Sequence, residues 1–257
     1  MIARRMGRVL GWLALSALMA PLVYACWLSF AADEFLTPPI DEWSLRWYGE
    51  FFRRPRWTAA LRESLLVGVL AVIGSLATGL PLAYALVRLH LRSEALVLGA
   101  ILLPLVVPPL LLGLGLVPAV QALGLWGTSL SLALAHSLYG LPMVCWLSRS
   151  AMLGIDSEIE HAARGLGAKP WQVAYRITLP LIGPSVLAGA VMAFVLSLNE
   201  FILSLFLATP ETETLPRVLW PNLRYTLSPL VAVASCVTTL ATAAGIAVAA
   251  WLLWRRR

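Results

Sequence analysis

The sequence predicts an all-α membrane protein, a polytopic bundle of six transmembrane helices. Its 257 residues are 60% hydrophobic and only 12% charged, with a mean hydropathy of +0.83. Soluble domains carry about 25% charged residues, so most of this surface is expected to face lipid. The formal net charge of +6 does not indicate nucleic-acid binding, because the basic residues flank apolar runs, where they set topology.

Apolar runs of about 20 residues or more, the length that crosses a bilayer, divide the chain into its spans. The run 95–148 is long enough for two helices, with a turn expected near 124–129, where glycines and a tryptophan suit an interfacial loop. The run 177–210 carries one charge, Glu200. One transmembrane domain, residues 1–257, therefore holds predicted spans at about 9–30, 62–87, 95–117, 129–149, 178–208 and 229–253.

The first apolar run could instead be a cleaved signal peptide, because arginines precede it. It is longer than the usual signal core of about 7–15 residues, and Tyr24 stands where a lipoprotein signal ending at Cys26 would prefer a small residue. An uncleaved span is the favoured interpretation. Cys26, Cys145 and Cys236 lie far apart in apolar runs, so neither a disulfide framework nor a metal site is predicted.

The distribution of basic residues predicts the orientation. If the N-terminus is cytoplasmic, twelve of the nineteen arginines and lysines fall in cytoplasmic segments and seven in outer ones. The positive-inside rule favours that arrangement. Both termini and the polar segment 151–180 are therefore expected in the cytoplasm.

The segment 151–180 is expected to contain a short amphipathic helix. Ser157 and Glu160 form an S-x-x-E pattern that predicts a capping box and a helix from about Glu158. An apolar stripe recurs at helical spacing, and the exposed face is expected to be largely alanine, which would let another surface approach closely. An interfacial helix lying on lipid headgroups fits the same periodicity. The stripe consists of Ile159, Ala162, Ala163 and Leu166.

Helix-ending residues follow this stripe. Gly167 suits a left-handed helix cap, Pro170 suits the first position of a second helix, and Leu179-Pro180 marks the return to the membrane.

The pattern Ala162-Ala163-x3-Gly167-x9-Ile177-x-Leu179-Pro180 resembles the EAA loop of binding-protein-dependent ABC importer permeases. The resemblance implies a cytoplasmic coupling helix between the fourth and fifth spans, seated in a cleft of an ATP-hydrolysing subunit. The family's usual glutamate falls on His161, which is a weaker and pH-sensitive ionic partner. The implied coupling residues are Glu160, His161, Ala162, Ala163, Gly167, Ile177, Leu179 and Pro180.

Prolines and one acid within apolar runs suggest a translocation path. Pro108 and Pro109 interrupt the third span, and such breaks are tolerated where they are buried in protein or line water; a packing kink is the alternative. Glu200, beside Asn199, should face the bundle interior because a charge at the bilayer centre costs roughly 2.5–3.5 kcal/mol. It could contact solute or form an internal hydrogen bond.

Nearly the whole chain resembles the polyamine/opine/phosphonate/iron class of permeases, and within it the spermidine/putrescine type, through segments such as "SLRWYGEFF" and "SLNEFILSLFLA". This implies a polyamine or another solute of that class, a bacterial inner-membrane location, an ATPase subunit dimer, a second permease (a sister chain or a second copy) and a periplasmic binding protein.

The chain is not expected to be an enzyme or to bind a cofactor. A P-loop needs Gly-Lys, and the only lysine, Lys169, follows Ala168, so ATP is expected on the partner subunit. A secondary transporter would need coupling-ion sites and usually a repeat. An intramembrane enzyme would need partners for His136, which is interpreted as a hydrogen-bonded packing residue.

Overall fold

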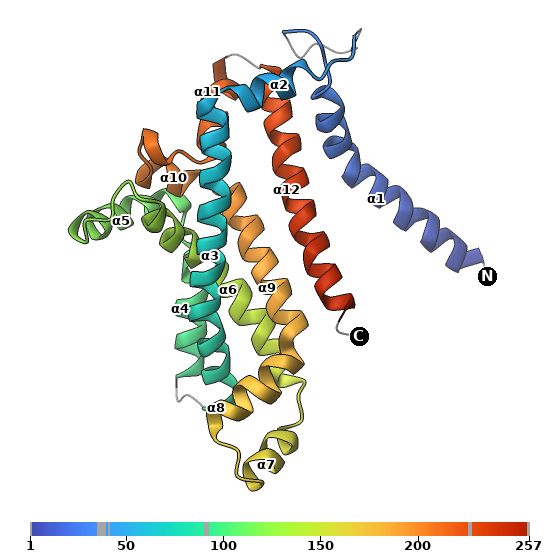
Figure 1. Cartoon of the computed structure of the whole chain (residues 1–257). Coiled ribbons are helices and arrows are strands. Elements are labelled where there is room, and N and C mark those ends of the chain that lie inside the picture. Colours follow the sequence, from blue (N-terminus) through green and yellow to red (C-terminus); the bar gives the residue numbers. More distant parts are fainter. Residues whose placement is uncertain (1, 35–39, 41, 90–92, 226–227, 256–257) are drawn as a thin grey trace. The chain divides into compact units, whose positions relative to one another are not determined.

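The computed structural model describes residues 2–34, 40, 42–89, 93–225 and 228–255, and these form helices joined by short turns (Figure 1). No β-sheet occurs among the described residues, which confirms the all-α prediction. The helices are α1 (Ile2–Leu28), α2 (Arg46–Arg53), α3 (Pro55–Arg88), α4 (Glu94–Val106), α5 (Pro109–Ala122), α6 (Ser129–Leu153), α7 (Ser157–Gly165), α8 (Pro170–Val173), the π-helical turn η1 (Ala174–Thr178), α9 (Leu179–Asn199), α10 (Ile202–Leu207), the short η2 (Pro210–Thr212), α11 (Leu215–Tyr225) and α12 (Pro229–Trp254).

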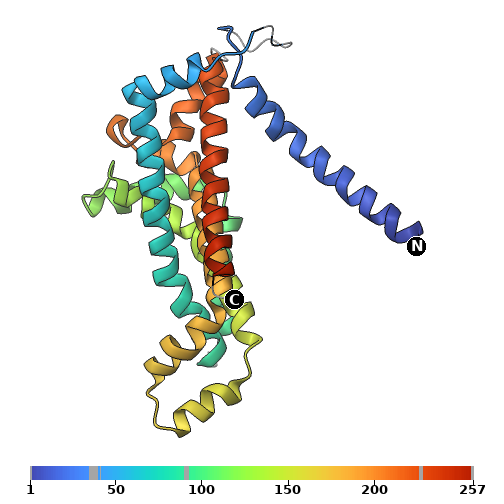
Figure 2. The same ribbon diagram turned by 45° about the vertical axis from the view of Figure 1, so that its right-hand side comes forward.

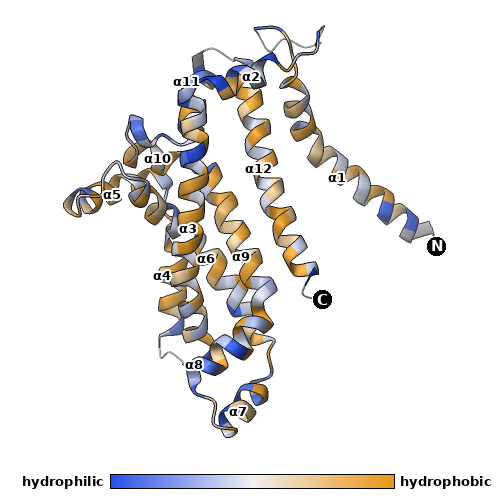
Figure 3. Ribbon diagram, in the orientation of Figure 1, coloured by the Kyte–Doolittle hydropathy of each residue, from blue (hydrophilic) through white to orange (hydrophobic). Residues whose placement is uncertain are grey.

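Five helical stretches of the described residues are long and apolar enough to cross a membrane: α1, α3, α6, the continuous stretch Pro170–Asn199, and α12. A sixth crossing comes from α4 and α5 together, which bend by 104° at the break between them. Arg88, at the end of α3, donates a hydrogen bond to the Met152 carbonyl at the end of α6. These two ends therefore lie on the same side, and the chain between them must cross twice, once in α4 and α5 and once in α6. Figure 3 shows the long helices as mostly hydrophobic.

The predicted third span, 95–117, is not one continuous helix. Val107 and Pro108 have extended backbone angles, ψ 130° at each. A residue before proline avoids the α region, so the pair Pro108-Pro109 ends α4, and Pro109 then starts α5. Pro104 in α4 and Pro81 in α3 stay inside their helices, so it is the consecutive prolines that break this span.

The helix that covers the predicted fifth span, 178–208, has different bounds at both ends. The helical stretch begins earlier, at Pro170, and passes through η1 into α9. It ends at Asn199, because Glu200 is extended with ψ 117°. The Glu200 carboxylate accepts a hydrogen bond from the Leu203 backbone N–H at 2.9 Å. Such local side-chain bonds compete with helix continuation, and a separate helix, α10, starts just beyond.

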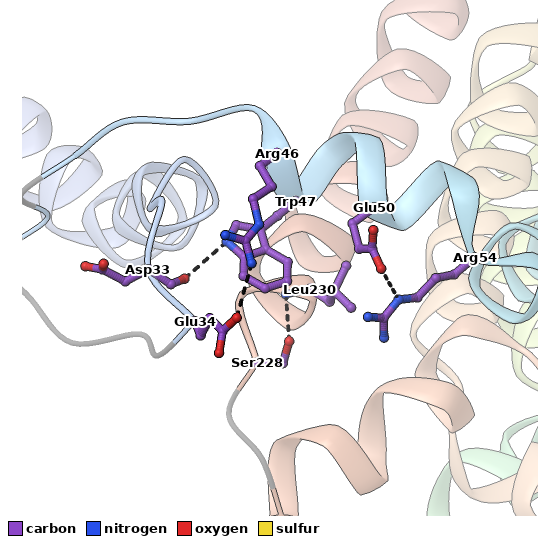
Figure 4. A network of polar contacts seen from close by, with 8 residues as sticks. All are labelled: Asp33, Glu34, Arg46, Trp47, Glu50, Arg54, Ser228 and Leu230. Carbon is purple, nitrogen blue, oxygen red and sulfur yellow. Dashed lines mark hydrogen bonds and ion pairs between the residues drawn. The ribbon is translucent and has the colours of Figure 1, made fainter.

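The chain divides into two compact units, residues 1–59 with 218–241 and residues 60–217 with 242–257. In the first, polar contacts tie α2 to the segment that follows α1 (Figure 4). Trp47 Nε1 donates to the Asp33 carbonyl at 3.1 Å, and Arg46 pairs with Glu34 at 3.3 Å. The Arg46 guanidinium lies 4.6 Å from the centre of the Trp47 ring.

The second unit is held together by close helix packing at small residues. A Cβ at Gly189 of α9 would lie 2.9 Å from the Val144 Cα of α6, and one at Gly79 of α3 would lie 3.0 Å from the Val144 side chain. Small residues let helices approach where lipid supplies no hydrophobic drive between them. Figures 1 and 2 show α7 beyond the ends of α3, α6 and α9.

Replacing Gly189 by alanine tests this packing. The added methyl meets α6 backbone that cannot rotate away, so we expect destabilisation by roughly 1–3 kcal/mol. Thermal unfolding in detergent would measure it. Gly99→Ala in α4, where nothing lies within 4 Å of the added Cβ, is the matched control. Equal melting temperatures for the two variants would contradict the close approach of α6 and α9.

Candidate functional site

The start of α7 is capped by Asp156, not by a capping box at Ser157. The Asp156 side chain accepts a hydrogen bond from the Glu158 backbone N–H at 3.0 Å, and α7 begins at Ser157. The predicted capping box is therefore wrong. Glu160 cannot reach back to the helix start because its carboxylate is bound elsewhere.

Glu160 is buried, with 1% of the residue exposed. Its Oε1 accepts hydrogen bonds from Arg88 Nη2 at 3.0 Å and from Thr178 Oγ1 at 2.8 Å, while Arg88 Nε lies 3.0 Å from Oε2. Arg164, one turn later in α7, lies at the longer distance of 3.8 Å. One carboxylate thus joins α7 to the end of α3 and to η1.

The polarity of α7 is inverted relative to an ordinary surface helix. Glu160 is its one buried residue, whereas Leu166 is 91% exposed and Ile159 48% exposed. His161 and Ala162 are also exposed, and Ala163 is half-buried. The exposed face is therefore more apolar and bulkier than the alanine face expected from the sequence. Exposed apolar surface of this kind typically marks an interaction site.

Gly167 ends α7 as the sequence predicts. Its φ of 89° is left-handed, and the Gly167 and Ala168 backbone N–H groups bond to the Arg164 and Ala163 carbonyls at 2.9 and 3.0 Å. This pair of bonds is a Schellman motif. Pro170 then occupies the first position of α8, also as predicted.

The predicted coupling residues fall in two places. His161, Ala162, Ala163 and Gly167 lie on or at the end of α7. Ile177, Leu179 and Pro180 lie instead in η1 and the first turn of α9. Leu179 lines an apolar cavity of about 500 Å³ with residues of α3, including Tyr84. These three residues therefore belong to the helix entry that supports α7.

The helices that follow the two breaks, α5 and α10, pack against each other. A Cβ at Gly113 of α5 would lie 2.6 Å from the Phe206 ring of α10, and Trp126 Nε1 donates to the Phe206 carbonyl at 3.2 Å. Pro108 and Pro109 precede this contact on one side, and Asn199 and Glu200 precede it on the other. Asn199 is exposed and donates to the Val195 carbonyl, whereas Glu200 is half-buried.

His136 of α6 forms hydrogen bonds on both sides of the break between α9 and α10. It is 1% exposed; its Nδ1 lies 2.8 Å from Ser197 Oγ, and its Nε2 lies 3.4 Å from Ser204 Oγ. The interpretation as a hydrogen-bonded packing residue is confirmed.

Sequence reasoning missed the partnership of Arg88 with Glu160. An arginine at the end of an apolar run is the only available signal in the sequence, and it does not identify the partner.

Comparisons with known proteins give consistent results. The family model described as "Binding-protein-dependent transport system inner membrane component" matches residues 49–255. The Escherichia coli K12 putrescine transport system permease protein PotI is 32% identical over 95% of this chain and 89% of its own length. The molybdenum transport system permease protein ModB of the same strain is 33% identical over 77% and 93%. In a crystal structure of a bacterial ABC transporter that imports alginate, one chain aligns with TM-score 0.67 at 17% identity, covering 99% of this chain and 96% of that one.

Gly167→Ala tests the ending of α7. A non-glycine residue in the left-handed region costs roughly 1–2 kcal/mol, so we expect faster hydrogen exchange of the amides in 157–168. Gly165→Ala is the control, because Gly165 is helical and nothing lies within 4 Å of its Cβ position. Unchanged exchange in Gly167→Ala would contradict the Schellman geometry.

Proposed function

This chain belongs to the family of binding-protein-dependent transport system inner membrane components, and we propose that it conducts a small organic cation of the polyamine class. It is a multi-pass permease subunit of an ABC importer in the inner membrane. The observation that carries the solute proposal is the carboxylate of Glu200 at a helix break within the membrane.

The face of α7 is the proposed docking surface for the ATPase subunit. Its exposed residues include the apolar side chains of Ile159, Ala162 and Leu166, with His161 and Gly167 beside them, and the charged Glu158 and Arg164 are exposed on the same helix. Glu160 points inward and acts in this proposal as a support for the helix. ATP would be bound and hydrolysed on the partner, because this chain has no Gly-Lys phosphate loop.

The proposed topology places α7 and both termini in the cytoplasm. The contact between Arg88 and Glu160 puts the end of α3 on the same side as α7, which agrees with a cytoplasmic position for both.

The remaining partners are a second permease, either a sister chain or a second copy, and a periplasmic binding protein. A related solved importer of alginate contains a substrate-bound periplasmic protein, which supports the latter.

The solute assignment rests on charge. PotI and the spermidine/putrescine permease PotC, 28% identical over 72% of this chain, are named for cationic solutes. Glu200 forms no ion pair with an arginine or lysine of the described residues, and its carboxylate accepts hydrogen bonds from the Leu203 and Ile202 backbone N–H groups. A carboxylate within a span that lacks a basic partner is suited to a passing cation.

An oxyanion is the second candidate, because the molybdenum permease ModB is as similar in identity as PotI. The carboxylate of Glu200 would repel an oxyanion such as molybdate. The two solutes are therefore separated by the effect of removing that charge.

Leu166→Asp tests the docking surface. A charge at the most exposed apolar side chain of α7 should reduce the ATPase copurified with a tagged chain by about tenfold or more, as loss of a central interface contact does. The ATPase is identified by its P-loop sequence and by ATP hydrolysis. The control is Leu45→Asp, at a leucine 66% exposed outside this loop. Equal recovery of ATPase by both variants would refute docking on α7.

Glu200→Gln tests the solute. The glutamine amide oxygen can still accept the Leu203 N–H bond, so the variant removes the charge and keeps the helix cap. We expect uptake of radiolabelled putrescine to fall by about tenfold, the loss that corresponds to about 1.4 kcal/mol, with ATPase copurification unchanged. Uptake of molybdate by the wild type, unimpaired in the variant, would establish the oxyanion alternative.

A further inference from the structure

We propose that Arg88, Glu160 and Thr178 form a strut that transmits the movement of α7 to α3 and α9 during transport. These three residues are called the strut below. The proposal rests on the proposed docking of α7 on the ATPase subunit, and it assigns a positioning role to residues that make no contact with solute or nucleotide.

The strut joins three elements at a single carboxylate. Arg88 is the last residue of α3, Glu160 lies in the middle of α7, and Thr178 is the last residue of η1, which runs directly into α9. Arg88 Nη2 and Thr178 Oγ1 donate to Glu160 Oε1 at 3.0 and 2.8 Å, and Arg88 Nε lies 3.0 Å from Oε2. Displacement of Glu160 must therefore move two transmembrane helices or break these bonds.

Glu160 is also the one polar link between α7 and the membrane helices in the described part of the chain. Every hydrogen bond that an α7 side chain makes to another element comes from this carboxylate. The other contacts of its polar side chains are local, such as the ion pair with Arg164. A force applied to the exposed face of α7 can thus reach α3 through this group, and it reaches α9 both through this group and along the backbone that joins α7 to α8.

The burial of the pair favours positioning over simple stabilisation. The Glu160 side chain is 2% exposed and that of Arg88 is 14% exposed. A buried ion pair gives little net stability relative to apolar residues of similar size, because desolvation offsets the attraction. What it does supply is geometry, since the planar guanidinium presents its donors in a fixed arrangement. Nη2 donates to Oε1, while Nε lies 3.0 Å from Oε2 without a hydrogen bond. The ends of α3 and α7 are thereby held in one orientation.

The decisive variant replaces both charged residues, Arg88→Met with Glu160→Met. Removing one partner would leave a buried unpaired charge and could prevent folding, whereas replacing both by apolar residues is often neutral for stability. The complex copurified through a tag on this chain is reconstituted in liposomes with the periplasmic binding protein. Bound ATPase, ATP hydrolysis and putrescine uptake are then measured on the same preparation.

We expect the double variant to retain the ATPase and its hydrolysis while the putrescine transported per ATP hydrolysed falls by about tenfold, within the range of energetic coupling changes. Arg88→Lys, which keeps the charge and loses the planar fork, should fall between wild type and double variant. A purely structural role would lower the amount of assembled complex and leave the transport per ATP unchanged.

The matched control is the double variant Arg149→Met with Glu94→Met. That ion pair also joins two helices, α4 and α6, but does not contact α7. The strut is refuted if both double variants transport equally well per ATP, or if uptake falls only in proportion to lost assembly. A wild-type complex that contains no ATPase, or does not transport putrescine, refutes the proposed function instead, and that result is visible before any variant is compared.

Discussion

A carboxylate that must be buried determines how α7 is turned against the ends of α3 and η1. Glu160 can lose its water only because Arg88 and Thr178 replace it, and this requirement turns α7 so that its charged residue faces inward. The apolar side chains Ile159 and Leu166 then have no place except the outer face. The exposed hydrophobic surface of α7 is thus a consequence of the ion pair beneath it.

Within the membrane, the corresponding constraint is that every interruption of a helix needs internal hydrogen-bond partners. At the α9–α10 break, the Glu200 carboxylate receives the Leu203 N–H, and His136 bonds to serines on both sides. At the end of α10, Arg217 donates to the Ala208 carbonyl. The α4–α5 break needs fewer partners because its two prolines have no N–H to satisfy. Internal hydrogen bonds therefore support the α9–α10 interruption, and the α4–α5 interruption has two fewer donors to satisfy.

Features governed by local chemistry could be predicted from the sequence. Apolar run length located the long spans, the left-handed preference of glycine located the cap at Gly167, and the fixed φ of proline located the start of α8. Features governed by distant contacts could not. Arg88 and Glu160 are far apart in sequence, and burial of Glu160 removed it from the predicted capping box, leaving that role to Asp156. The end of α9 was missed because a side-chain bond at Glu200 outweighs the apolar pattern that continues beyond it.

The division between scaffold and path explains why permeases named for putrescine and for molybdenum resemble this chain to a similar degree. Close packing through Gly79 and Gly189, and the buried pair under α7, hold helices together, and neither depends on the charge of the solute. Charge selectivity needs only a few groups at the interruptions, where backbone and side chains can face water. Whole-chain similarity therefore reflects the scaffold, and one carboxylate such as Glu200 carries more information about the solute than the many residues that hold the helices together.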